Sequence, residues 1–415
     1  MNICLLCRFG ADPLIPWGMM ELNRQFCLGF FVATCLLLGL YSYTNNLFLR
    51  ELAIPRLIKS EEEDDLTMEV SLLTEKPMYA ADSQIWIRMQ QYFPEVIGRL
   101  KRDFLPEYKN PCFLEGNRTR CLPYFYLGGA PKCGTTDLWF NLLRHPRVFK
   151  NIVKEPHFLK NIPKTYSGTE KYLNHFDTFA KWVSGDPYGA AKSVVGDGSA
   201  STLWANYDIV KKAGIQTEGE IPFVFADVIH AIHPKAKVIF ILRDPTNRTI
   251  SDYFLFSRDK SPTHFHAKVV QKIEWFEQCL RSRSLKSCAN VLGSRDIPRL
   301  GISVYIAHIR EWLRVFPKDQ VLILRTEDWH YHEDTNLLQD VFKFLDIEAL
   351  PESNLQPIKK KETLNEIKSK QITQRQSNKH GDILPKTRKL LDEFYAPYNK
   401  QLATFLKDKR FLWNT

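Results

Sequence analysis

The segment 124–139 has the residue types and spacing of an anion-binding loop. It reads YFYLGGAPKCGTTDLW, in which an apolar stretch runs into a glycine-containing turn and then into a helix that opens at Gly134, Thr135 and Thr136. Such a turn can wrap backbone N–H groups around an anion, and the helix N-terminus adds partial positive charge. Lys132 adds a full charge, and the threonine hydroxyls add donors. The segment therefore predicts a site for a phosphate-like group.

The loop differs from the Walker A loop of nucleoside triphosphatases. Gly129 and Gly134 have the Walker spacing, but Thr135 stands where that motif requires lysine, and Lys132 lies inside the loop instead. A magnesium-dependent kinase is therefore the weaker alternative. An ordinary glycine-containing turn between a strand and a helix is the structural alternative, and it does not explain Lys132 together with two threonines.

A second candidate anion site follows the apolar run KVIFIL at 237–242. The next residues are RDPTNRTISDY, with Arg243 at the expected strand end and Ser251 eight residues later on a helix. An arginine can pair with a phosphate monoester through two parallel hydrogen bonds, and the serine can donate another. A Walker B strand ending at Asp244 is the competing interpretation. Arg248 could orient the loop.

The sequence KEPHF supplies groups that suit an alcohol acceptor. Removing a hydroxyl proton requires a base, and negative charge on a leaving oxygen requires nearby positive charge. Lys154, Glu155 and His157 provide these groups, although an exposed turn before a proline is the plain structural alternative. Asp197 and Ser199 follow another predicted strand, where Asp197 could instead cap a helix.

Taken in order, APKCGTTDLW, KEPHF and RDPTNRTISDY resemble motifs of the carbohydrate (glycosaminoglycan) sulfotransferases over roughly 105–415. The resemblance implies that 3′-phosphoadenosine 5′-phosphosulfate (PAPS) is the sulfuryl donor and that no metal is needed. It implies that the donor nucleotide is bound by Lys132, Cys133, Gly134, Thr135 and Thr136 at the 5′-phosphosulfate, by Arg243 and Ser251 at the 3′-phosphate, and by Lys379 and Gly381 in a loop that closes over the adenosine phosphates. On the acceptor side it implies Glu155 as base, assisted by Lys154 and His157, with Asp197 and Ser199 near the acceptor. The chain departs from the family pattern at Ala200, where a proline is usual, and in the Lys379–Gly381 loop.

The strings APKCGTTDLW, KEPHF and LLDEFYAPYN are most similar to the branch of the family that sulfates the 6-hydroxyl of N-acetylgalactosamine 4-sulfate in chondroitin or dermatan sulfate. Another glycosaminoglycan, such as heparan sulfate, is an alternative acceptor. A protein that binds glycans without turnover is a further alternative. The sequence leaves the oligomeric state open.

Apolar runs at 124–129, 193–197, 237–242 and 321–325 predict buried strands, with helices between them. Amphipathic helices are expected after Gly134, at 301–316 and at 387–406, with Pro397 kinking or interrupting the last. Strands alternating with helices predict an α/β fold, a P-loop-like three-layer sandwich with a largely parallel central sheet. Ligands of such sheets bind at the carboxyl ends of the strands.

Residues 25–49 contain no formal charge and would span roughly 37 Å as a helix, enough for ~30 Å of hydrocarbon. We expect a type II signal-anchor in the Golgi membrane rather than a cleaved signal peptide. The expected organisation is a cytosolic tail (1–24), the anchor (25–49), a stem (50–104) and a lumenal sulfotransferase domain (105–415). An amphipathic helix within 85–100 could start the folded part. The net charge of +10 favours acidic partners such as a sulfated glycosaminoglycan, and no motif indicates nucleic acid.

The cysteines of the predicted lumenal part suggest two short-range disulfides. Cys112 and Cys121 bracket one short loop, and Cys279 and Cys288 bracket another, although reduced buried thiols are the alternative. The first loop contains the glycosylation sequon at Asn117, which we expect to be modified.

Overall fold

The structure is a computed structural model that describes residues 87, 90–100, 103–160, 166–186, 189–212, 220–294, 297–331, 335–351 and 383–413. The predicted tail, the predicted anchor at 25–49 and most of the predicted stem lie outside these ranges. Among the helices within them, none is both long and apolar enough to cross a membrane.

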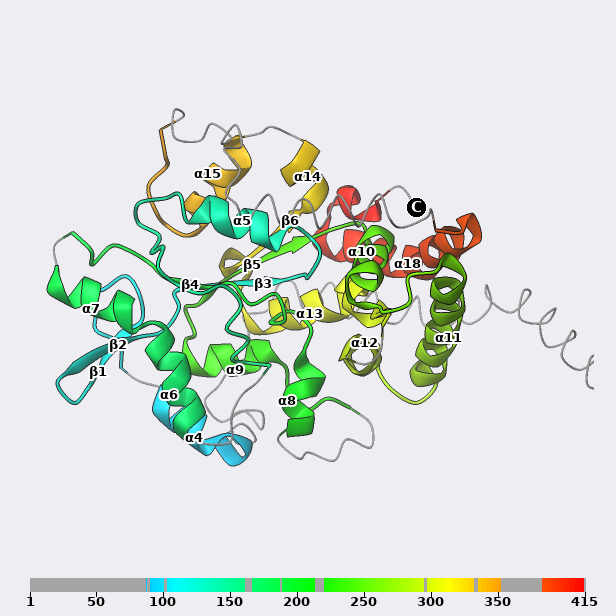
Figure 1. Ribbon diagram of the computed structural model, residues 1–415. Helices are drawn as coiled ribbons and strands as arrows, with labels where there is room; N and C mark the ends of the chain where they lie inside the picture. The colour runs from blue at the N-terminus through cyan, green and yellow to red at the C-terminus, as the bar shows by residue number, and fades with distance from the viewer. Residues whose placement is uncertain are drawn as a thin grey trace, which may run out of the picture. The chain divides into compact units, whose positions relative to one another are not determined.

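A four-stranded parallel sheet forms the centre of the fold (Figure 1). Its strands run in the order β4 (Gly196–Asp197), β3 (Phe125–Gly129), β5 (Lys237–Leu242) and β6 (Val321–Arg325). All residues of β3 are buried, and so are all but the first of β5. Strands covered on both faces read as continuous apolar runs, which is why the sequence located them. The predicted strand at 193–197 is reduced to the two residues of β4.

Helices cover both faces of this sheet. Figure 1 shows α5, α14 and α15 on one side and α9 and α13 on the other, which confirms the three-layer arrangement. The helices are α4 (Pro94–Leu100), α5 (Thr135–Leu142), α6 (Tyr166–His175), α7 (Asp177–Gly185), α8 (Asn206–Lys212), α9 (Phe225–Ile232), α10 (Pro245–Phe256), α11 (Pro262–Leu280), α12 (Leu285–Ser294), α13 (Tyr305–Val315), α14 (Thr326–Tyr331), α15 (Thr335–Phe344) and α18 (Pro385–Leu406).

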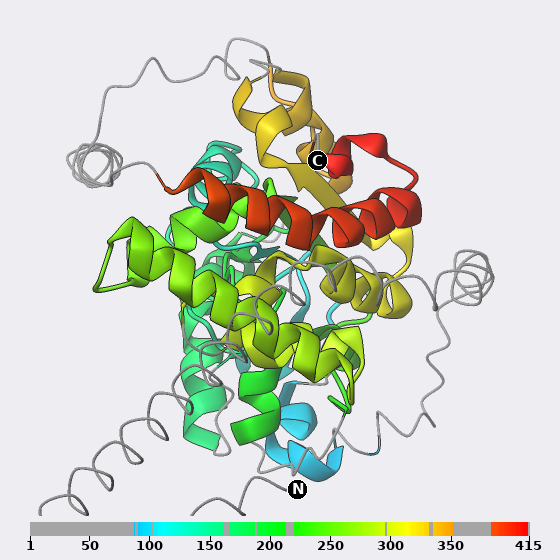
Figure 2. The same ribbon diagram turned by 90° about the vertical axis from the view of Figure 1, so that its right-hand side faces the viewer.

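The long helix α18 packs against α10, α11 and α13 (Figure 2). It runs without interruption through Pro397, so of the two expected effects, a kink or an interruption, the interruption was wrong. Proline removes one backbone hydrogen bond, but Leu391, Tyr395 and Leu402 bury the same face on both sides of it. Burying a large apolar side chain contributes roughly 1.5–3 kcal/mol, so these contacts offset the lost bond.

A small hairpin of β1 (Cys112–Glu115) and β2 (Arg118–Cys121) precedes the sheet. The disulfide Cys112–Cys121 closes its base, and Cys279–Cys288 joins α11 to α12, which confirms both predicted pairs. Asn117 lies exposed at the turn of the hairpin. The amphipathic run at 85–100 contributes α4, whose Val96, Ile97 and Leu100 are buried in the core.

At the base of the hairpin, a fully buried arginine joins it to the neighbouring helices. The Arg120 guanidinium is 2.9 Å from a carboxylate oxygen of Glu170 on α6 and 2.6 Å from one of Asp177 on α7. It also lies 3.3 Å from Glu115. A buried arginine that pairs with carboxylates from three elements holds the hairpin, α6 and α7 in a fixed arrangement, because its charge would be uncompensated away from them.

Candidate active site

The predicted phosphate loop (residues 129–136) connects β3 to α5. Lys132 and Gly134 adopt left-handed backbone conformations, with φ of 72° and 89°. Gly134 is the N-cap of α5, so the first N–H groups of that helix, which lack partners within the helix, face the loop. Gly128 precedes the loop, and a Cβ there would lie 2.7 Å from the ring of Phe240. The sequence therefore needs small residues here for close packing as well as for the turn.

Lys132 provides a cation that nothing in the described part of the chain neutralises by direct contact. Its side chain is half-buried, and its ammonium forms no hydrogen bond or ion pair with the described residues. Burial lowers the pKa of Lys132, while the carboxylate of Asp252 opposes that shift. A partly desolvated cation without a partner is costly, which suits a site that takes an anion.

Arg243 directly follows β5, the strand beside β3, and Ser251 lies in the following helix α10. Both side chains are half-buried, and neither has a hydrogen-bonding or ion-pairing partner among the described residues. Because β3 and β5 are parallel neighbours, their carboxyl ends bring Arg243 and the phosphate loop to one edge of the sheet. The phosphate loop and Arg243, from which the two anion sites are predicted, thus follow neighbouring strand ends.

Asp244 does not occupy the position of a free Walker B carboxylate. Its Oδ1 accepts a hydrogen bond of 2.7 Å from the backbone N–H of Asn247 and so caps α10. This use of the carboxylate weighs against the kinase alternative.

Arg248 is fully buried and ties the arginine element (residues 243–251) to the segment around Arg299 and Ser303. Its guanidinium donates to the Ser303 hydroxyl and, at 3.0 Å, to the carbonyl of Arg299. Asp252 lies 3.5 Å from the same guanidinium, and Arg299 Nε donates to it at 2.9 Å. Sequence reasoning missed Asp252 and Arg299, although the i,i+4 spacing of Arg248 and Asp252 was a signal for a helical ion pair.

The turn at residues 154–157, called the carboxylate turn, brings three predicted residues together. Lys154 donates to Oε1 of Glu155, and Nε2 of His157 lies 3.6 Å from Oε2. Glu155 and His157 both have positive φ, 64° and 52°, which non-glycine residues adopt only when their surroundings hold them there. The neighbouring His157 side chain, and then Lys154, lower the pKa of Glu155 to about 2 despite partial burial. The carboxylate is therefore ionised at neutral pH.

Residues after β4 support this turn. The backbone N–H of His157 donates to Ser199 Oγ at 2.9 Å, and its Nδ1 lies 2.8 Å from Ser201 Oγ. Asp197 is only 3% exposed; its oxygens accept from the Ser199 N–H and from the hydroxyl of Tyr172, each at 2.9 Å. Asp197 thus lies behind the turn and holds Ser199, which in turn holds His157. The role of Ser201 was not evident from the sequence.

One short stretch links the carboxylate turn to the phosphate loop. Ser199 and Ser201 contact His157, while the Leu203 N–H donates to the carbonyl of Gly128 at 2.8 Å. We call residues 199–203 the linking segment. It places the candidate base and the candidate anion site on the same edge of the sheet. Lys379 and Gly381 lie outside the described residues.

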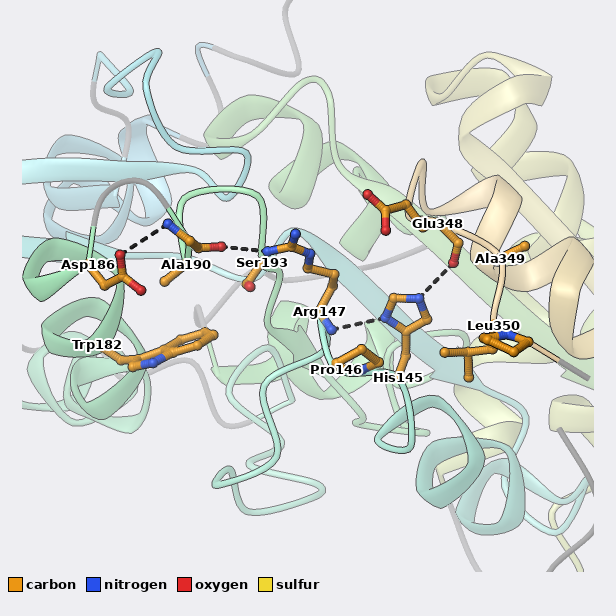
Figure 3. Close-up of a pocket in the computed structure, with 12 residues that line it drawn as sticks. His145, Pro146, Arg147, Trp182, Asp186, Ala190, Ser193, Glu348, Ala349 and Leu350 are labelled. Atoms are coloured by element: carbon orange, nitrogen blue, oxygen red, sulfur yellow. Dashed lines mark hydrogen bonds between the residues drawn. The ribbon is translucent and has the colours of Figure 1, made fainter. Parts of the chain in front are cut away.

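The cavity shown in Figure 3 is a separate feature. It measures about 370 Å³ and is lined by residues that include His145, Arg147, Trp182 and Glu348. None of the predicted site residues lines it. Its Ser193 and Ala190 precede β4, so the cavity lies toward the amino ends of the strands, away from the phosphate loop.

Comparison with known proteins identifies the family. A family model described as "Sulfotransferase domain" matches residues 123–391. Carbohydrate sulfotransferase 15 of Mus musculus is 38% identical over 320 residues, which are 72% of this chain and 56% of that protein. The Homo sapiens protein of the same name is 37% identical over 321 residues, with the same shares. The chain thus spans little more than half the length of these relatives.

More distant similarities extend to other sulfotransferases. Bifunctional heparan sulfate N-deacetylase/N-sulfotransferase 3 of Homo sapiens is 25% identical over 318 residues, 72% of this chain and 32% of that protein. A solved sulfotransferase from Alicyclobacillus acidocaldarius aligns with a TM-score of 0.44 and 19% identity, over 71% of this chain and 99% of that one. The match at 123–391 includes the phosphate loop, the carboxylate turn and the arginine element, and the chain belongs to the sulfotransferase domain family.

Proposed function

We propose that this chain transfers the sulfuryl group of PAPS to a sugar hydroxyl of a glycosaminoglycan, the 6-hydroxyl of N-acetylgalactosamine 4-sulfate in chondroitin or dermatan sulfate. One observation carries the proposal. Lys132 and Arg243 are half-buried cations without partners among the described residues, and they lie at neighbouring strand ends. The linking segment holds His157, and with it the carboxylate turn that carries Glu155, on the same edge.

The residues present fit a nucleotide with an anion at each end. Lys132, the N-terminus of α5 and the hydroxyls of Thr135 and Thr136 bind the 5′-phosphosulfate. Arg243 and Ser251 bind the 3′-phosphate. Cys133 has a fully buried side chain, so its contribution to the loop comes from the backbone and from packing. Lys379 and Gly381 are proposed to close over the adenosine phosphates.

Glu155 accepts the proton of the acceptor hydroxyl while the sugar oxygen forms its bond to sulfur. The bond between sulfur and the bridging oxygen breaks, and Lys132 stabilises the electron pair that remains on the departing 3′-phosphoadenosine 5′-phosphate. Lys154 and His157 orient the carboxylate, and Ser199 and Asp197 support them. A positioned base contributes about 10²–10⁴-fold, and most of the remaining acceleration comes from positioning and electrostatics.

The acceptor class is supported by the name of the relatives and by charge. Proteins called carbohydrate sulfotransferase 15 match 72% of the chain, and the net charge of +10 suits a polyanionic acceptor. Heparan sulfate is the second candidate, supported by the 25% identity to the N-deacetylase/N-sulfotransferase.

We also propose a type II Golgi membrane protein that is anchored by 25–49 and glycosylated at Asn117. The support is the uncharged stretch, the exposed position of Asn117 and the similarity to a membrane-associated sulfotransferase of Dictyostelium discoideum, 23% identical over 317 residues.

The test uses the full-length chain in detergent, with radiolabelled PAPS and a panel of chondroitin, dermatan and heparan sulfates, followed by disaccharide analysis. We expect label on the 6-position of 4-sulfated N-acetylgalactosamine. Lys132→Ala should remove transfer, whereas Lys343→Ala, at an exposed position on α15, should not. Transfer to no glycan, together with tight binding of magnesium-ATP and none of 3′-phosphoadenosine 5′-phosphate, would overturn the proposal.

A further inference from the structure

The buried hydroxyl groups of Tyr305 and Thr326 each contact both the phosphate loop and the chain where β5 runs into the arginine element. The Tyr305 hydroxyl donates to the carbonyl of Arg243 at 2.9 Å and lies 3.7 Å from Sγ of Cys133. Thr326 Oγ1 lies 2.7 Å from the carbonyl of Cys133 and 2.9 Å from that of Leu242. Tyr305 therefore contacts the phosphate loop and the first residue of the arginine element, and Thr326 contacts the phosphate loop and the last residue of β5, directly before Arg243.

The conformation of the phosphate loop directs Cys133 toward these hydroxyls. Because Lys132 and Gly134 on either side are left-handed, the intervening side chain turns into the core, where it is 0% exposed. Burial raises the pKa of the Cys133 thiol to about 11, so the group keeps its proton. The thiol lies 3.7 Å from the Tyr305 hydroxyl, and that hydroxyl donates to the Arg243 carbonyl, so the three groups form one continuous path of contacts.

The two hydroxyls come from different elements of the scaffold. Tyr305 is the first residue of α13, and Thr326 is the first residue of α14, directly after β6. Tyr305 is 1% exposed and Thr326 is 7% exposed, so water does not replace either contact easily. Thr326 has one proton to share between two carbonyl oxygens, which holds both chain segments at a fixed separation.

We propose that Tyr305 and Thr326 are positioning residues that set the distance between the two anion sites, so that a nucleotide phosphorylated at both the 3′ and 5′ ends binds more tightly than either site alone would allow. This inference rests on the proposed function. When the distance between two sites is fixed, a ligand bound at one site makes its contact with the other at high effective concentration. The gain in affinity falls when that distance varies. A nucleotide with one phosphate uses one site and is insensitive to the separation.

The test compares three ligands by calorimetry with the full-length protein: 3′-phosphoadenosine 5′-phosphate, adenosine 5′-phosphate and adenosine 3′-phosphate. Tyr305→Phe and Thr326→Val should each lose about tenfold in affinity for the bisphosphate, since a lost buried hydrogen bond has about that effect. Both monophosphates should change by less than about twofold.

Two controls separate positioning from general damage. Thr326→Ser keeps the hydroxyl and should retain the wild-type preference for the bisphosphate. Tyr398→Phe removes a hydroxyl that has no hydrogen bond among the described residues, and it should leave all three affinities unchanged.

Equal losses for all three ligands, a loss confined to one monophosphate, or an unchanged bisphosphate affinity would each overturn the inference. Thr326→Ser losing the preference would do the same. These outcomes differ from failure of the proposed function, in which the wild-type protein itself would not bind 3′-phosphoadenosine 5′-phosphate.

Discussion

Replacing Glu155 by glutamine tests the proposed chemistry most directly, because it keeps the shape of the side chain and removes its ability to accept a proton. We expect the turnover rate to fall by about 10²–10⁴-fold, equivalent to about 2.7–5.5 kcal/mol of transition-state stabilisation. Donor affinity should be unchanged, because Lys132 and Arg243 rather than Glu155 hold the nucleotide in the proposed site.

The same substitution has a defined effect on stability. The pKa of Glu155 is lowered to about 2 in the folded chain, by His157 first and by Lys154 as well. A lowered folded pKa contributes stability that is fully present above the unfolded value near 4.5 and is lost as the pH falls toward 2. The full shift corresponds to roughly 3 kcal/mol. Because the side chain is 38% exposed, solvent screening reduces this to about 1 kcal/mol.

The assay combines radiolabel transfer from PAPS with urea unfolding at pH 7 and pH 2. Glu107→Gln is the matched control, since Glu107 is exposed. Glu155→Gln should be about 1 kcal/mol less stable than wild type at pH 7 and equal to it near pH 2. The reasoning is refuted if the variant keeps more than about a tenth of the wild-type turnover, or if an acid limb of turnover between pH 5 and 7 disappears with the substitution.

Three further predictions follow. Lys132→Ala should abolish transfer and weaken 3′-phosphoadenosine 5′-phosphate binding at least tenfold in calorimetry, because it removes the charge at the phosphosulfate; unchanged affinity would contradict this assignment. Arg248→Met should lower the free energy of unfolding in urea by about 3–5 kcal/mol, because it takes one of two partners from the buried Asp252; a loss below about 1 kcal/mol would argue against a buried ion pair. Replacing Cys112 and Cys121 by serine should lower the free energy of unfolding, measured by thermal unfolding, by about 2–4 kcal/mol. Adding reductant should then lower the stability of the variant less than that of the wild type.

The central sheet could be predicted because its strands are buried on both faces. The apolar runs at 237–242 and 321–325 coincide with β5 and β6, and the glycine-rich turn after β3 identified the phosphate loop. Apolar runs and glycine-rich turns of this kind can be recognised from a few consecutive residues. The family resemblance then connected three separate motifs in one site.

Other parts of the site depend on contacts between distant segments. Nothing near Tyr305 or Thr326 indicates that their hydroxyls meet at Cys133, which is 172 and 193 residues away. The position of Asp197 behind Ser199 depends on Tyr172 from α6. β4 is shorter than its apolar run, because only Gly196 and Asp197 pair with β3, while Val194 makes an isolated bridge to Val148. Local pattern cannot report partners of this kind.

The linking segment contacts only one side of the carboxylate turn, which bears on how acceptor choice could change. Ser199 accepts a hydrogen bond from the backbone of His157, while Val153, immediately before the turn, is 71% exposed. In the proposed function, substitutions at Val153 would change the surface beside the carboxylate turn without altering the contacts that hold His157. Acceptor choice and proton transfer would then depend on opposite sides of one short peptide.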